Sequence, residues 1–126
     1  MGKRYLLDTN TVIDFMGGKF PPKPKASLSK IIDEEINLSV INKIELLSFS
    51  KDEQDLNDFV EYSDIYMIDD NIVNKTIEIR QKYKTKLPDA VIAATSLQHS
   101  FTLITNNVKD FKNIKGLDFV NPYEDL

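Results

Sequence analysis

The feature that most constrains the fold of this chain is the alternation of short apolar runs with longer segments of helical periodicity. Five runs have strand character, at residues 4–7, 38–41, 65–68, 102–104 and 117–120. Between them, apolar residues recur every three or four positions, which is typical of helices packed on a core. Strands that alternate with helices form a mainly parallel sheet with helices on both faces. The sequence therefore predicts an α/β fold with three layers.

Turn and capping residues delimit the expected helices. The first helix follows Asp8-Thr9-Asn10 and ends near Gly17-Gly18. The proline-rich segment 20–25 is expected to be an exposed, stiff loop before a helix that begins at Ser27 as its N-cap. Further helices are predicted over residues 43–50, 55–62, 71–83 and 88–98.

Composition limits the class of protein and the chemistry. A chain of 126 residues is expected to form a single domain, residues 1–126, and no apolar run or signal peptide points to a membrane, so we expect a soluble, cytoplasmic protein. The chain has no cysteine and one histidine, so a bound metal would need oxygen ligands. The net charge of −4 argues mildly against a surface made wholly for nucleic acid, although it does not exclude a nuclease.

Four acidic residues accompany apolar segments at the ends of predicted elements. Asp8 directly follows the first strand, Asp89 lies in the first turn of an apolar helix, and Asp110 follows the fourth strand. Glu45 lies one turn into the helix after the second strand. Ligands of open α/β sheets bind beyond the carboxyl ends of the strands, and a hard cation such as Mg²⁺ takes oxygen ligands. The pattern therefore predicts a metal site for phosphate-ester chemistry.

Each acid also has an ordinary structural interpretation. Asp8 could only cap the following helix, Glu45 could face water at a helix edge, and Asp89 could complement the helix dipole. Asp110 follows a polar turn of a common kind. The nearby basic residues are interpreted mainly as solvated side chains; they are Lys43, Arg80, Lys109 and Lys112.

Polar neighbours are expected to orient the carboxylates, as metal sites require. In the loop after the fourth strand, Asn107 competes with Asp110 as the fourth contributor. The expected supporting residues are Thr9, Asn10, Thr105 and Asn107.

With these motifs identified, the chain resembles the PIN-domain ribonucleases, specifically the VapC-type toxins of toxin-antitoxin pairs. Five segments occur in the family's order and approximate spacing: Leu6-Leu7-Asp8-Thr9-Asn10, Ser39-Val40-Ile41-Asn42-Lys43-Ile44-Glu45-Leu46, Leu87-Pro88-Asp89-Ala90-Val91-Ile92-Ala93-Ala94, Thr105-Asn106-Asn107-Val108-Lys109-Asp110-Phe111 and Asn121-Pro122-Tyr123. The resemblance implies a five-stranded parallel sheet in the order 3-2-1-4-5, a Mg²⁺ or Mn²⁺ site and cleavage of single-stranded or loop RNA. It also implies a homodimer and a cognate antitoxin as partners.

Carried over residue by residue, the resemblance assigns Asp8, Glu45, Asp89 and Asp110 as metal ligands and catalytic acids. Many relatives carry an acid where this chain has Asn107, which is given a neutral supporting role. Asn42 stands where threonine is frequent, and we expect this departure to affect only the surroundings of the site.

Two alternatives use the same layout differently. A noncatalytic PIN domain would bind RNA or protein without turnover. A phosphoacceptor receiver domain would use Asp69-Asp70 as acceptor and Thr105 as hydroxyl, but it predicts an acid pair after the first strand, where this chain has only Asp8.

Overall fold

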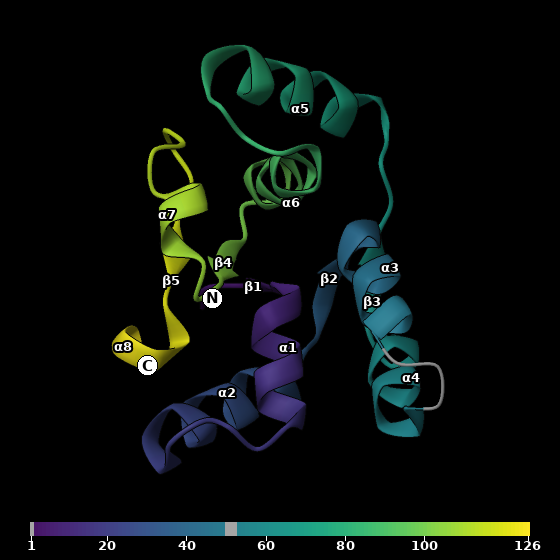
Figure 1. Ribbon diagram of the computed structural model, residues 1–126, viewed down its shortest axis with the longest axis vertical. Coiled ribbons are helices and arrows are strands. Elements are labelled where there is room, and N and C mark those ends of the chain that lie inside the picture. The colour runs from purple at the N-terminus through teal and green to yellow at the C-terminus, as the bar shows by residue number, and fades with distance from the viewer. Residues whose placement is uncertain (1, 50–52) are drawn as a thin grey trace.

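The structure is a computed structural model that describes residues 2–49 and 53–126 (Figure 1). Strands and helices alternate along most of the chain, so the predicted α/β class is confirmed. In chain order the elements are β1 (Tyr5–Leu7), α1 (Thr9–Met16), α2 (Pro22–Glu34), β2 (Asn37–Ser39), α3 (Val40–Phe49), α4 (Gln54–Glu61), β3 (Asp64–Tyr66), α5 (Asp70–Lys82), α6 (Leu87–Gln98), β4 (Thr102–Ile104), α7 (Val108–Phe111), β5 (Phe119–Val120) and α8 (Pro122–Asp125).

Two apolar cores lie on opposite faces of the strands and create three layers. In the parallel neighbours β1 and β4, Leu6 pairs with Leu103 and Leu7 with Ile104. Leu6 and Leu103 belong to the core that α5, α6 and α7 cover, whereas Leu7 and Ile104 belong to the core under α1, α2 and α4. Consecutive strand residues point to opposite faces, so each short strand serves both cores. Figure 1 shows α5 and α6 on one side of β1 and β4, with α1 and α2 on the other.

The strands form two parallel groups rather than one continuous sheet. Backbone hydrogen bonds join three strands in the spatial order β1-β4-β5, and they join β2 to β3 separately. Although β1 and β2 are neighbours, no ladder connects them within the described residues. The continuous order 3-2-1-4-5 that the resemblance implies is therefore not confirmed.

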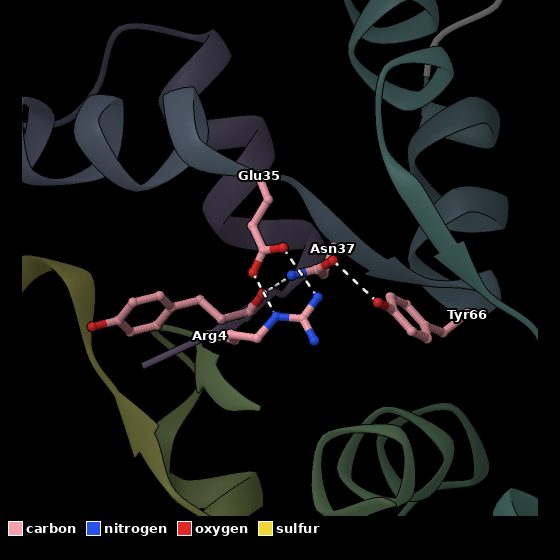
Figure 2. Close-up of polar contacts among 5 residues, drawn as sticks. Arg4, Glu35, Asn37 and Tyr66 are labelled. Carbon is pink, nitrogen blue, oxygen red and sulfur yellow. Dashed lines mark hydrogen bonds and ion pairs between the residues drawn. The ribbon is translucent and has the colours of Figure 1, made fainter. Parts of the chain in front are cut away.

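Side chains connect β1 to β2 where the ladder is interrupted (Figure 2). The fully buried Asn37 donates from Nδ2 to the Tyr5 carbonyl oxygen at 3.0 Å, and its Oδ1 accepts from the Tyr66 hydroxyl at 3.4 Å. Beside them, Arg4 pairs with Glu35 at 2.9 Å. In a continuous sheet, a backbone N–H of the neighbouring strand would donate to a carbonyl oxygen of β1. Here the side-chain amide of Asn37 donates to the Tyr5 carbonyl oxygen instead.

The proline-rich segment was wrongly expected to be an exposed loop. Helix α2 already begins at Pro22, five residues before the predicted N-cap Ser27, and it ends at Glu34. Proline is favourable in the first turn of a helix because its fixed φ suits the helix and its missing N–H would have no partner there. Phe20 is 6% exposed and joins the core under α1, α2 and α4.

Four expected strands are shorter than predicted, and the first of them, predicted over 4–7, is β1, which begins at Tyr5. The strand predicted over 38–41 is β2, which ends at Ser39, because Ser39 and Asn42 cap α3: the Ser39 N–H donates to Asn42 Oδ1 at 2.9 Å and the Asn42 N–H to Ser39 Oγ at 3.2 Å. This reciprocal pair is a capping box, which starts the helix at Val40. The strands predicted over 65–68 and 117–120 are reduced to β3 and β5. Ser50, the last residue of a predicted helix, lies outside the described residues.

Helix α6 lies at the centre of the fold. Its residues 90–96 are all buried, because α5 covers one side of it and β4 and β2 lie on the other. His99 is the C-cap of α6, and its ring packs against Tyr66 and Phe101. In the part of the chain that the structure describes, no helix is both long and apolar enough to cross a membrane.

Candidate active site

The four predicted acids lie on four different elements. Asp8 follows β1 and is the N-cap of α1, and Glu45 lies in the middle of α3. Asp89 occupies the first turn of α6, and Asp110 lies in the short helix α7. Asp8 is buried, Asp89 and Asp110 are half-buried, and Glu45 is exposed. Position alone therefore gives each carboxylate a different environment.

Asp8 accepts more hydrogen bonds than the other three predicted acids. Its side chain is 5% exposed and accepts four hydrogen bonds. Oδ1 accepts from the Thr9 N–H at 2.9 Å and from Asn42 Nδ2 at 3.4 Å, and Oδ2 accepts from Thr105 Oγ1 at 2.8 Å and from Asn10 Nδ2 at 3.1 Å. Burial raises the pKa of Asp8, and the bonds from Thr105, Thr9 and Asn10 oppose that rise. Asp8 caps α1, as its structural interpretation held, and it is also the centre of a polar cluster.

One chain of hydrogen bonds leads from Asp8 to Asp110. Thr105, which directly follows β4 and is fully buried, donates from its hydroxyl to Asp8 and accepts from the Asn107 N–H at 3.0 Å. The Asn107 amide then donates to Asp110 Oδ2. Asn107 and Asp110 are thus bonded to each other, so the two candidates for the fourth position act together in this structure.

A second chain of hydrogen bonds leads from Asp8 to Glu45. The Thr9 hydroxyl donates to Glu45 Oε1 at 2.6 Å and accepts from Asn42 Nδ2 at 3.1 Å. Glu45 is exposed, as its alternative interpretation expected, but its carboxylate is held toward Asp8 rather than free in solvent.

Asn42 contributes more to the site than its sequence position suggested. It is fully buried, its Oδ1 caps α3, and its Nδ2 reaches both Asp8 and Thr9. The available signal was the spacing Ser39-x-x-Asn42 before an apolar helix, which resembles a capping box. Threonine has no amide group to make all of these bonds at once.

Asp89 joins the cluster through charge rather than hydrogen bonding. Among the described residues, no side chain donates to its carboxylate. Burial is the main cause that raises the pKa of Asp89 to about 6, and the charges of Asp8, Asp110 and Glu45 contribute to this rise, against a smaller opposing effect of Lys86. The three other acids are thus close enough for Asp89 to experience their charge.

The carboxylate oxygens of these acids are suitable ligands for a hard cation, but the side chains are not arranged in a preformed coordination geometry. Over residues 2–49 and 53–126, no three acidic or histidine side chains are grouped closely enough to bind one ion directly. Mg²⁺ commonly keeps several waters and binds proteins through one or two carboxylates. The mutual repulsion that raises the pKa of Asp89 is the kind of interaction that a bound cation relieves. A cation at these acids would therefore complete its coordination shell with water.

The receiver-domain alternative does not fit the structure. Asp69 caps α5 by accepting from the Ile72 N–H at 2.9 Å, and the Thr105 hydroxyl is bonded to Asp8. Asp69 therefore acts as a helix cap rather than as a phosphate acceptor, and the Thr105 hydroxyl is bonded to Asp8 rather than to Asp69.

Comparison with known proteins gives the same family as the motifs. The PIN domain family matches residues 5–117. Ribonuclease VapC1 of Rickettsia felis is 46% identical over 44 residues, and the match spans only 32% of this chain and 33% of that protein. A toxin-antitoxin complex from Klebsiella pneumoniae contains a chain with 32% identity and a TM-score of 0.76, with coverage of 95% of this chain and 98% of that one.

A third comparison bears on the fold alone. VapBC-1 from nontypeable Haemophilus influenzae has a TM-score of 0.78 at 23% identity, covering 94% of this chain and 97% of that one. The resemblance to VapC-type proteins that the motifs indicated is confirmed by these relatives. The match over most of the chain shows that this protein belongs to the PIN-domain family.

Proposed function

We propose that the protein is a Mg²⁺- or Mn²⁺-dependent endoribonuclease that cleaves single-stranded or loop RNA, and that it is the toxin of a toxin-antitoxin pair. The main support is the polar cluster around Asp8. Hydrogen bonds link Asp8 to Glu45 and Asp110, and charge couples the cluster to Asp89.

In this proposal Asp8, Glu45, Asp89 and Asp110 hold the cation directly or through water. A bound Mg²⁺ or Mn²⁺ would stabilise the negative charge that develops on the phosphoryl and leaving oxygens during hydrolysis. Thr105 and Asn10 fix the orientation of Asp8, and Asn107 fixes that of Asp110. Glu45, which is exposed and accepts a hydrogen bond from Thr9, would accept a proton from an attacking water in this proposal.

The proposed partners rest on the relatives. The chain from Klebsiella pneumoniae belongs to a toxin-antitoxin complex, and the Rickettsia felis relative is named a ribonuclease. By analogy we assign this protein an RNA substrate, an antitoxin partner and a homodimeric state. Expression in a bacterial host tests the toxin role: we expect growth arrest with the wild-type protein and normal growth with Asp8→Asn.

A direct cleavage assay tests the activity. Purified protein is incubated with RNA that carries single-stranded loops in Mg²⁺ or Mn²⁺, and we expect cleavage that EDTA abolishes. Asp8→Asn and Asp89→Asn should each slow cleavage by at least about a hundredfold, because each removes one carboxylate from the cation site. The exposed Asp33→Asn on α2 is the matched control and should cleave at the wild-type rate. Wild-type rates in both site variants would contradict the proposal.

A noncatalytic RNA-binding role is the second candidate, and one observation favours it. The Asp8 carboxylate already accepts four hydrogen bonds, so it has little capacity left for a direct metal bond. This candidate predicts that the wild-type protein binds RNA in Mg²⁺ or Mn²⁺ without cleaving it. The same assay, followed by a binding measurement, separates the two.

A further inference from the structure

A cleft lined by lysines opens beside the proposed active site. It has a volume of about 300 Å³ and lies between the end of α5, the segment 83–86 and α7. Its wall includes Lys82, Lys84, Lys109 and Asp110. Asp110 is linked through Asn107 and Thr105 to Asp8, so the cleft borders the hydrogen-bonded cluster at Asp110. We call this cleft, defined by Lys82, Lys84 and Lys109, the lysine cleft.

A second hollow extends the lysine cleft away from the acids. It has a volume of about 130 Å³ and shares Lys82, Tyr83 and Ile114 with the lysine cleft. Lys75 and Lys115 lie on its wall. Glu78 also lies on this wall, and the two hollows together form a lysine-rich path that Asp110 borders.

The charge of this path contrasts with the charge of the whole chain. The protein carries a net charge of −4, yet the three lysines of the lysine cleft are exposed and have no ion-pair partner among the described residues. Farther along the path, Lys75 pairs with Glu78 at 3.1 Å. Lys86 continues the alternation of lysines along the segment and is near enough to Asp89 to lower its pKa. Unpaired cations gathered in a concave site attract a polyanion more strongly than scattered ones do.

We propose that the lysine cleft binds the phosphodiester backbone of the RNA strand adjacent to the phosphate that is cleaved. The proposal rests on the proposed nuclease function, and it adds where the substrate strand runs. Successive phosphates are covalently linked, so a strand with one phosphate at the carboxylates must place its next phosphates nearby. The lysine cleft offers cations at that point, where the acids themselves would repel the strand.

The proposal explains how an acidic protein can hold an acidic substrate. The carboxylate cluster repels RNA, whereas the lysine cleft next to it supplies compensating positive charge. Backbone contacts of this kind position a strand without reading its sequence. We therefore expect the lysine cleft to contribute affinity rather than base preference.

The test compares two triple variants with equal changes in charge. Lys82→Gln, Lys84→Gln and Lys109→Gln are combined in the cleft variant. The control combines Lys23→Gln, Lys25→Gln and Lys30→Gln, three exposed positions on α2. Figure 1 places α2 at the opposite end of the molecule from α5. Binding of a fluorescent single-stranded RNA is measured by anisotropy in EDTA, where no cleavage occurs, over a series of salt concentrations.

For the cleft variant we expect at least about tenfold weaker binding. The slope of log K against log salt concentration should also be shallower by about 2, because three phosphate contacts are lost. The control should bind like the wild type. A double variant, Lys82→Gln with Lys84→Gln, leaves α7 unchanged and should show about two-thirds of the change in slope. Equal binding by the cleft variants and the control would overturn the proposal.

Three further outcomes distinguish the lysine cleft proposal from the nuclease proposal and from a general polyanion site. If the wild type cleaves RNA and the cleft variants bind and cleave as well as the control, the nuclease function stands and the lysine cleft proposal fails. If the wild type never cleaves RNA but the cleft variants lose binding, the nuclease proposal fails and the lysine cleft remains an RNA site. Displacement of the RNA by polyglutamate at equal charge concentration would show a general polyanion site and overturn the assignment to RNA.

Discussion

Asp8 and Asp89 have the same side chain but different hydrogen bonding and exposure within the candidate site. Both carboxyls have a raised pKa, for which burial is the main cause. Four hydrogen bonds compensate the buried Asp8, whereas the half-buried Asp89 faces the charges of its acidic neighbours without such bonds. Removing the charge of Asp89 should therefore relieve repulsion and leave the fold intact.

We predict that Asp89→Asn stabilises the protein at pH 7.5 in the absence of divalent cations. In the folded protein the pKa of Asp89 is raised from 3.8 to about 6. Between those values the folded state holds more protons than the unfolded state, so wild-type stability falls as pH rises from about 4 to about 6 and is level above that. The gain should be about 1 kcal/mol, because solvent screens a half-exposed group.

Urea unfolding in EDTA at pH 4 and pH 7.5 provides the measurement. The two proteins should differ little at pH 4, because Asp89 is largely protonated in the folded state there and the pH is still close to its unfolded pKa of 3.8, so little stability has been lost. A variant that is less stable than the wild type at pH 7.5 would contradict the assigned repulsion.

Asn42 is predicted to be a structural support for the acids. Asn42→Ala removes the capping interaction of α3 and the amide that bonds to Asp8 and Thr9, leaving buried partners unsatisfied. We expect a loss of about 2 kcal/mol in unfolding free energy, measured by urea titration. Asn57→Ala, at an exposed position of α4, is the control and should cost much less. Equal losses in the two variants would show that the Asn42 bonds add nothing.

At the scale of elements, a side-chain hydrogen bond connects α8 to α1. Asn121 caps α8, and the Tyr123 hydroxyl donates to Asp14 of α1 at 2.7 Å. The Tyr123 ring stacks on Phe20 with 4.4 Å between centroids. Burial and the hydrogen bond to Asp14 together raise the pKa of Tyr123 to about 12. The motif Asn121-Pro122-Tyr123 therefore has a structural explanation, outside the acidic cluster.

We predict that Tyr123→Phe lowers the unfolding free energy by about 1 kcal/mol, because the ring remains and only the hydrogen bond to Asp14 is lost. Thermal unfolding is the measurement. Tyr62→Phe is the control, since Tyr62 is 84% exposed, and it should unfold like the wild type. An unchanged transition in Tyr123→Phe would mean that water replaces the bond without cost.

The sequence was informative about the elements but less so about their limits. Apolar periodicity identified the five predicted strands and the helices α1 to α6, because each must bury one stripe or face, but it did not identify the short helices α7 and α8. It missed the start of α2 at Pro22, since the prolines of this segment were interpreted as a loop signal rather than as first-turn residues. It also extended β2 into residues that the capping pair Ser39 and Asn42 commits to α3.

At the scale of the whole molecule, hydrogen bonds and charge couple four carboxylates from different elements, and the unpaired lysines of the lysine cleft lie beside one of them, Asp110. A cation that binds this site in the folded state must stabilise the protein, because the unfolded chain separates the acids. We predict that Mn²⁺ or Mg²⁺ raises the wild-type melting temperature at pH 7.5. The increase should be smaller at pH 5, where Asp89 with its pKa of about 6 is largely protonated.

Differential scanning fluorimetry with and without the cation measures this shift. Asp33→Asn should respond like the wild type, and Asp89→Asn should respond less. An equal shift in Asp89→Asn would indicate that the cation binds elsewhere on this acidic protein.

The sequence by itself determined the α/β class, the positions of Asp8, Asp89 and Asp110 at the ends of elements, and the lack of cysteine and of more than one histidine, because these depend on local periodicity and composition. Only the tertiary structure decided how the acids are joined. The bonds from Thr105 and Asn42 to Asp8 connect residues 97 and 34 positions apart, and no local pattern reports them. The interruption between β1 and β2 at Asn37 and the lysine cleft beside Asp110 likewise arise from packing between distant segments.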